Sequence, residues 1–461
     1  MKLNQRQVQH LYHRAGFGAS FSEVKKAIGK SADKLFDELF APAENPEYIK
    51  VFEFQEGLFA KFKDADKEAR KAMLKTAREG VIDLNLLWLA QMVRTKGFLR
   101  EKMTLFWHDH FASESKNPYF AQRQNNLLRQ HALGNFRDLL FAISKDQVML
   151  KYLNNQQNRK KSPNENFARE VMELFTLGRG NYTETDIKEA ARAFTGWGFN
   201  RQGDFVFRSK QHDYDKKTVF GKTGRFDGKD MLNMLLAQKQ TARYLSTKIY
   251  QYFVNPKIDE ARINQLADIF YQSDYDIKSL LKAIFTSDWF YDDEHIGKRI
   301  KSPIEFVASL QKTFFLQFED AMAPLFIQKV LGQILFKPPN VAGWPDGKSW
   351  IDSSTLMFRL KIPEVIFRSH EFALAAKASG DAFDDLRRLR QFKSLKTSIN
   401  WDAFSAQFKK VKDHKLANVL GNYLIQTKTD VSIVKSSATN RHDQLKDLVL
   451  NFTKLPDYQL C

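Results

Sequence analysis

Residues 162–180 read Ser-Pro-Asn-Glu-Asn-Phe-Ala-Arg-Glu-Val-Met-Glu-Leu-Phe-Thr-Leu-Gly-Arg-Gly, and they predict the helix around which the chain is organised. Ser162 can accept hydrogen bonds from the free N–H groups of a first turn. Pro163 suits the first helical position, and Glu165 is placed to complete a capping box. Gly178 can adopt the left-handed conformation that ends a helix. We therefore expect a helix between Ser162 and Gly178.

This helix carries acidic side chains beside its apolar face. At about 100° per residue, Phe167 and Val171 lie on the apolar arc, whereas Asn166, Glu170 and Glu173 form a stripe at its border. Charged groups in that position need partners. We interpret the stripe as the wall of a functional pocket, with Asn166 as a binding residue.

Glu170 and Glu173 are the candidate catalytic residues. Two carboxylates at positions i and i+3 can ligate a divalent metal or divide acid and base roles between them. The alternative is a structural ion network, because buried networks of this kind fix large helical folds. The arginines that could complete such a network are Arg14, Arg129, Arg169 and Arg192.

Composition favours a mainly α-helical protein. The 461 residues include 40 Phe but only 12 Pro and 21 Gly, which is typical of packed helices rather than turn-rich β architecture. We predict a helical body over residues 1–370, with C-terminal helices over 371–461 that pack on it. The one β signal is a ribbon in which residues 204–208 and 217–220 pair.

The formal net charge of +18 allows an anionic partner. The basic residues are spread along the chain, and Arg159-Lys160-Lys161 is the one tight cluster, so solvated helix faces explain most of the excess. Nucleic acid is therefore an unlikely partner, and polyanion binding stays an alternative. The partner, whether ligand or protein, is unknown from the sequence.

Two histidine motifs raise the possibility of a divalent metal. His108 and His110 flank Asp109, but on a helix an i, i+2 pair points in directions about 200° apart. The competing expectation is a buried, hydrogen-bonded His110 and a surface His108. His212 and Asp213, in the predicted ribbon, are further candidate metal ligands.

Other candidate binding residues come from helices and loops. His10, His13 and Arg14 share one helical face, where they form either a donor set or a surface polar stripe. Arg169 adjoins the acidic stripe. Trp197, Trp344 and Trp350 lie in or beside glycine-rich loops, where aromatic rings either bind ligands or plug the core.

Several functional classes lack support in the sequence. It contains no phosphate-binding P-loop, dinucleotide fingerprint, zincin motif or nucleophile elbow. The single cysteine, Cys461, excludes an intrachain disulfide and suits a reducing compartment. Because no signal peptide or transmembrane segment is visible, we expect a soluble, cytoplasmic protein.

The motifs resemble a bacterial family known as domain of unknown function 1800. The matching stretches are Leu11 to Gly18, Phe106 to Phe111, Asn164 to Glu170, Glu173 to Gly178, Phe194 to Trp197, and Pro338 to Pro345. The resemblance implies no particular activity, cofactor or catalytic residue. Many relatives look exported, so the resemblance makes an exported location possible here too.

Taken together, the residues favour a binding or accessory protein with a polar carboxylate–histidine pocket. Its walls would be the stripe of Asn166, Glu170 and Glu173, together with His110 and the Trp344 loop. The first alternative is a metal- or carboxylate-assisted hydrolase that uses Glu170 and Glu173. The second is a polyanion or nucleic-acid binder.

Overall fold

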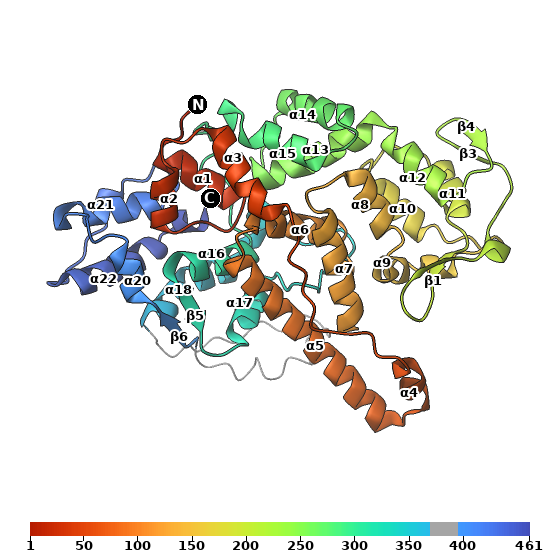
Figure 1. The fold of residues 1–461 in the computed structure, drawn as a ribbon, viewed down its shortest axis with the longest axis horizontal. Coiled ribbons are helices and arrows are strands. Elements are labelled where there is room, and N and C mark those ends of the chain that lie inside the picture. Colours follow the sequence, from red (N-terminus) through yellow and green to blue (C-terminus); the bar gives the residue numbers. More distant parts are fainter. Residues whose placement is uncertain (369–394) are drawn as a thin grey trace.

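The computed structural model describes residues 1–368 and 395–461, and it confirms the mainly α-helical class (Figure 1). Within these residues, no helix combines the length and apolar character that crossing a membrane requires. The helices are α1 (Gln5–Arg14), α2 (Phe21–Ala27), α3 (Ala32–Phe40), α4 (Leu58–Asp64), α5 (Lys67–Arg94), α6 (Phe98–His110), α7 (Pro118–His131), α8 (Phe136–Ile143), α9 (Gln147–Tyr152), α10 (Asn166–Glu173), α11 (Glu184–Ala193), α12 (Gly228–Leu236), α13 (Lys239–Phe253), α14 (Glu260–Gln272), α15 (Ile277–Phe285), α16 (Pro303–Phe314), α17 (Ala323–Leu331), α18 (Ser353–Arg368), α20 (Trp401–Ala406), α21 (Asp413–Leu424) and α22 (Arg441–Thr453).

The strands form small antiparallel pairs. The pairs are β1 (Trp197–Phe199) with β2 (Phe205–Phe207), β3 (Lys217–Val219) with β4 (Lys222–Gly224), and β5 (Leu316–Phe318) with β6 (Thr397–Ile399). The expected pairing of residues 204–208 with 217–220 is therefore wrong. Each of these strands finds a partner nearer in the chain, because glycines with positive φ at Gly203 and Gly221 permit tight reversals.

Side-chain caps set several helix starts as the sequence indicates. Capping boxes form between Asn4 and Gln7 at α1, and between Ser302 and Glu305 at α16. The box predicted at Ser162 does not form. Ser162 instead bridges to Arg159, and α10 begins only at Asn166.

The start of α10 is held by asparagine side chains. The side chain of Asn158 accepts a hydrogen bond from Asn164 N (3.0 Å), and that of Asn164 accepts one from Asn166 N (3.0 Å). These bonds engage the N–H groups of Asn164 and Asn166, and Ser162 N donates to the carbonyl of Arg159, so the helix begins only after this turn. Helix α10 ends at Glu173, earlier than expected, and Gly178 beyond it has the predicted left-handed conformation, with φ +78°.

Helix α1 buries the polar face that could have been a surface stripe. Arg14 and His10 are fully buried, and the His10 ring lies 4.6 Å from that of Phe290. The surface alternative is wrong for these residues because α1 packs against later parts of the chain. Arg14 donates from Nη2 to the carbonyl of His295 (3.1 Å).

The C-terminal helices pack beside the N-terminal ones (Figure 1). The Tyr423 hydroxyl donates to the carbonyl of Ala19 (2.8 Å), and the rings of Phe21 and Phe408 stack 4.5 Å apart. Arg299 and Cys461 also exchange backbone hydrogen bonds near the end of the chain. The predicted boundary at residues 370 and 371 lies outside the described residues, so the division into two domains stays a prediction.

A buried ion cluster joins these parts of the chain. Glu305 accepts hydrogen bonds from Lys102 Nζ of α6, from Arg299 Nη1 (2.6 and 2.8 Å) and from Ser302 N (2.7 Å). Burial opposes ionisation of Glu305, but the charges of Arg299 and Lys102 hold its pKa well below the usual range. The carboxylate is therefore ionised and forms ion pairs with two buried cations.

We predict that Glu305→Ala lowers the free energy of unfolding by about 3–5 kcal/mol, because it leaves Lys102 and Arg299 buried without an anion. Urea unfolding followed by circular dichroism measures the loss. The matched control is Glu319→Ala, at an exposed position, which should change the free energy by less than about 0.5 kcal/mol. Equal effects of the two substitutions would contradict the role of the cluster.

Candidate functional site

The two acids of the predicted pocket differ in their partners. Glu173 accepts hydrogen bonds from the guanidinium of Arg179 (2.5 Å) and the hydroxyl of Tyr182. The Tyr182 hydroxyl bond, with Arg179, lowers the pKa of Glu173 despite partial burial. Glu170 is half-buried, and its carboxylate makes no hydrogen bond or ion pair with any described residue. Burial, then the charge of Glu173, raises the pKa of Glu170.

The other polar residues of α10 have ordinary structural partners. Asn166 donates from its side chain to the carbonyl of Leu153 (3.2 Å). Arg169 forms ion pairs with Glu165 and Glu184 at distances of 3.2 and 2.8 Å. It pairs with neither Glu170 nor Glu173, and Arg14, Arg129 and Arg192 likewise have other partners. The structural network expected from the sequence is therefore not formed, and Glu173 pairs with Arg179 instead.

The end of α6 places His108 and His110 in separate surroundings. His110 is buried and shares a hydrogen bond with the carbonyl of Phe175 (3.2 Å), as one sequence-based alternative expected. His108 is only 3% exposed, so its expected surface position is wrong. Its Nε2 accepts from Phe336 N (3.0 Å), and this bond turns the ring into the protein. Burial lowers the pKa of both imidazoles.

Between the two histidines, Asp109 holds the loop that carries Trp344. Its carboxylate accepts a hydrogen bond from Trp344 N (2.7 Å), and the ring of Trp344 lies 5.4 Å from that of His108. The preceding Gly343 has φ +87°, and a Cβ there would collide with Asp109. Glycine is therefore required both by the backbone conformation and by this close approach.

Asp109 belongs to an electrostatic group with Asp346 and Lys248. Burial raises the pKa of Asp109 to about 7, the hydrogen bond from Trp344 N opposes the rise, and the charge of Asp346 adds to it. The pKa of Asp346 is also raised, chiefly by loss of hydration, against the charges of Arg299 and Lys248. A carboxyl group with a pKa near 7 can donate or accept a proton at neutral pH.

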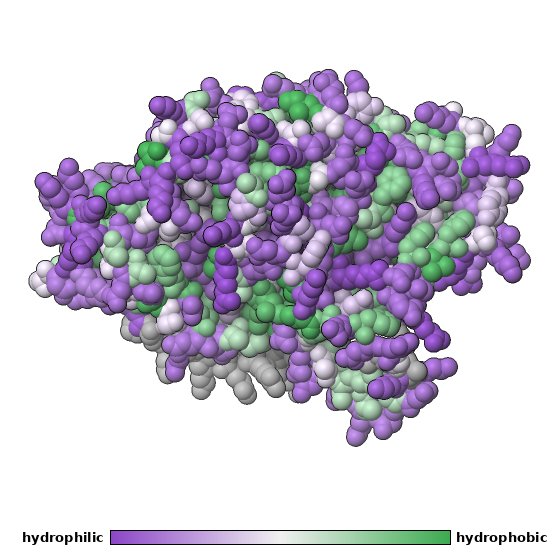
Figure 2. All heavy atoms as spheres, in the orientation of Figure 1, coloured by the Kyte–Doolittle hydropathy of each residue, from purple (hydrophilic) through white to green (hydrophobic). Residues whose placement is uncertain are grey.

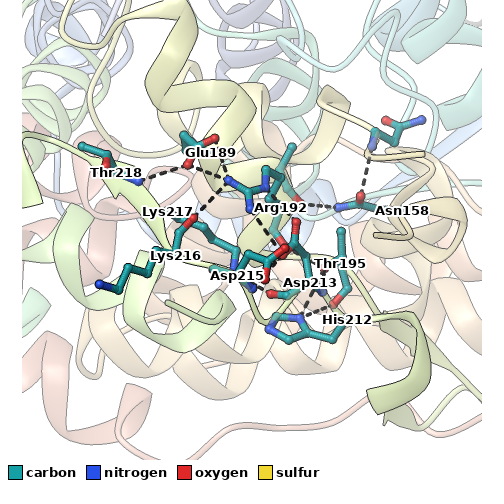
Figure 3. A network of polar contacts seen from close by, with 12 residues as sticks. Asn158, Glu189, Arg192, Thr195, His212, Asp213, Asp215, Lys216, Lys217 and Thr218 are labelled. Carbon is teal, nitrogen blue, oxygen red and sulfur yellow. Dashed lines mark hydrogen bonds and ion pairs between the residues drawn. The ribbon is translucent and has the colours of Figure 1, made fainter. Parts of the chain in front are cut away.

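His212 and Asp213 belong to a different network, on α11 and the strand β3 (Figure 3). Asp213 accepts from the Arg192 guanidinium (2.7 Å), which also bonds to Glu189 (2.9 Å). His212 Nδ1 donates to the carbonyl of Thr195 (2.9 Å). Figure 3 shows Asp213 directed toward Arg192 and the His212 ring below Thr195. These contacts tie the segment before β3 to α11.

The aromatic candidates are packed down. Trp197, Trp344 and Trp350 are 3–6% exposed, which fits the core-plugging alternative rather than presentation to a ligand. Trp197 packs edge-on against Phe194 and Phe205.

The candidate metal ligands are not gathered into one site. Within residues 1–368 and 395–461, no group of three or more His, Cys, Asp or Glu side chains could hold a metal ion. His108 and His110 bond to different backbone groups, and His212 and Asp213 lie in the Arg192 network.

A groove of about 1000 Å³ opens where the two ends of the chain meet. Arg6 of α1 and Lys428 both pair with Asp293 on its wall. Lys257, Lys298 and Lys348 are exposed along the same groove and form no ion pair with any described residue. Glu294 is the second acid in the lining, so five cations face two acids. The lining residues are Arg6, Asn255, Pro256, Lys257, Asp293, Glu294, Ile296, Lys298, Ile300, Gly347, Lys348, Thr427, Lys428 and Leu460.

Residues 10–460 match the model of a family described as Protein of unknown function (DUF1800). The chain belongs to this family. No curated protein and no solved structure matches it. The family description names no activity, so the chemistry of this DUF1800 chain has to be argued from its own residues.

Sequence analysis of the DUF1800 chain missed Asp109, Asp346, Lys248 and the groove lysines. Asp109 stands inside the aromatic motif Phe106 to Phe111, and Asp346 directly follows the motif Pro338 to Pro345. A carboxylate in an otherwise apolar motif is a usable signal, because its burial requires a partner. Single lysines that are distant in the sequence and come together only in the folded chain leave no comparable sequence pattern.

We predict that Asp109 makes the stability of the DUF1800 chain fall as pH rises from about 4 to about 7. Its carboxyl is protonated to higher pH in the folded chain, with a pKa of about 7, than in the unfolded chain, at about 3.9. The stabilising proton is therefore lost across this window. Asp109→Asn should match the wild type near pH 4 and exceed its free energy of unfolding by on the order of 1–3 kcal/mol at pH 8.

Urea unfolding at pH 4, 6 and 8 checks this pH dependence. Asp83→Asn, at an exposed position of α5, is the matched control and should follow the wild type throughout. A constant difference between Asp109→Asn and the wild type at all three pH values would contradict the shifted titration of Asp109.

Proposed function

We propose that this protein is a binding protein for a ligand with several anionic groups, and that the ligand occupies the groove between α1, the residues after α13 and the end of the chain. The observation that supports this most is the group of lysines Lys257, Lys298 and Lys348. They face one groove of about 1000 Å³ without an ion-pair partner among the described residues.

The physical argument is one of uncompensated like charge. Cations that share a concave surface repel one another and together raise the local positive potential. Asp293 offsets part of this charge, but it is already engaged by Arg6 and Lys428. A ligand that brings several negative groups to the free lysines would relieve the repulsion.

The lining also limits the chemistry of the ligand. Lysine ammonium groups act as point charges and bind phosphate or sulfate oxygens without strict geometry. No aromatic side chain is present among the described lining residues, so the groove offers no aromatic ring on which bases or sugar rings could stack. The ligand class that fits is a flexible chain rich in phosphate or sulfate groups, and nucleic acid stays an unlikely partner.

The other hypotheses keep a narrower basis. The carboxylate–histidine pocket stays a prediction. Of its two acids, Glu173 is engaged by Arg179, and only Glu170 has no hydrogen-bond partner in the described structure. The hydrolase hypothesis is favoured instead by Asp109, a carboxyl that titrates near neutral pH. Both are compatible with an anionic ligand in the nearby groove, since Gly347 and Lys348 of its lining directly follow Asp346.

We expect the triple variant Lys257→Gln/Lys298→Gln/Lys348→Gln to bind a fluorescent heparin oligosaccharide and sodium polyphosphate at least tenfold more weakly than the wild type. The reason is the loss of three charge contacts, and the wild-type affinity itself should fall steeply between 50 and 200 mM salt. Fluorescence polarisation, with polyphosphate as competitor, measures both effects.

The control variant removes the same charge elsewhere. Lys67→Gln/Lys71→Gln/Lys75→Gln changes three exposed lysines of α5 and should retain wild-type binding. If both triple variants lose affinity equally, binding reflects net charge alone and the groove is not the site. Undiminished binding by the groove variant would also contradict the proposal.

A further inference from the structure

A second cavity differs from the basic groove in that its walls are mainly apolar. It has a volume of about 600 Å³. It opens between the projecting half of α5 on one side and, on the other, the α6–α7 connection, the start of α7 and helix α9. Figure 1 shows α5 extending beyond the body with α4 at its tip, and Figure 2 shows apolar surface on this projecting lobe. Its apolar walls are formed by Met73, Leu74, Ala77, Phe120, Val148 and Tyr152.

The shape follows from one close contact at Gly80. A Cβ at Gly80 would meet Pro118 Cγ at 2.9 Å and the ring of Phe52 at 3.1 Å, so α5 touches the start of α7 there. Because α7 begins at Pro118, the part of α5 before Gly80 has no helix of α7 beside it. The two elements separate beyond this point and leave the apolar face of α5 uncovered.

The polar residues of the cavity gather at the side opposite α5. Lys116 and Lys151 are exposed in its lining and form no ion pair with any described residue. Glu114 is the acid in the same lining, so the charges leave one excess cation.

We propose that this cavity binds a single-chain amphiphile with an anionic head, such as a long-chain fatty acid. The acyl chain lies along the apolar face of α5, and the carboxylate is placed between Lys116 and Lys151. Cavities of about 300–1000 Å³ with apolar walls and a few convergent polar groups are typical of small-molecule sites. The charge at the rim favours an anionic over a neutral head.

The first test fills the cavity. Binding of cis-parinaric acid, followed by its fluorescence and reversed by palmitic acid, should weaken at least tenfold in Ala77→Phe. Ala72→Phe introduces the same side chain on an exposed position of the same helix, outside the cavity lining, and should bind as the wild type does. Equal affinities of the two variants, or no binding by the wild type, would overturn the proposal.

The second test addresses the head group and does not depend on the fold of Ala77→Phe. Wild-type protein should bind palmitic acid at least fivefold more tightly than palmityl alcohol, measured by competition at concentrations at which both are monomeric. Lys116→Gln/Lys151→Gln should abolish this preference while it keeps affinity for the alcohol. An alcohol that competes as well as the acid in the wild type would overturn the assignment of an anionic head.

Discussion

The fold depends on one buried carboxylate that neutralises two buried cations. Glu305 stands at the start of α16, bonds to Arg299 and to Lys102 of α6, and also caps its own helix through Ser302. Lys102 further donates to the carbonyl of Gly16 (3.0 Å) at the end of the first helical segment. Elements far apart in the sequence are therefore fixed by a single charge. Without it, the Lys102 ammonium and the Arg299 guanidinium would remain unpaired in an apolar interior, at a cost of several kcal/mol.

The position of Arg299 has a consequence at the surface. Its backbone pairs with Cys461, and its neighbours Lys298 and Ile300 form part of the groove wall. The buried cluster thus places a lysine where α1 and the last residues of the chain meet. The two neighbouring cations differ in their partners: Arg299 is neutralised by Glu305, whereas Lys298 forms no ion pair with any described residue.

Local rules predicted the helices better than the site. The capping boxes at Asn4 and Ser302 and the left-handed Gly178 follow from interactions within a few residues, so the sequence contains the required information. The Ser162 box failed because Ser162 N, which the Glu165 side chain would have to bond, donates instead to the carbonyl of Arg159. The burial of His108 depends on Phe336, a partner far outside the windows that such patterns cover. The groove is harder still, since its lysines come from separate loops and converge only after the two ends of the chain have packed together.

The most direct measurement is a crystal structure of the protein soaked in sodium tungstate, with the oxyanions located by their anomalous scattering. The account predicts the strongest peak in the groove, within hydrogen-bond distance of at least two of Lys257, Lys298 and Lys348. Ordered tungstate at other surface lysines, with no peak in this groove, would contradict it.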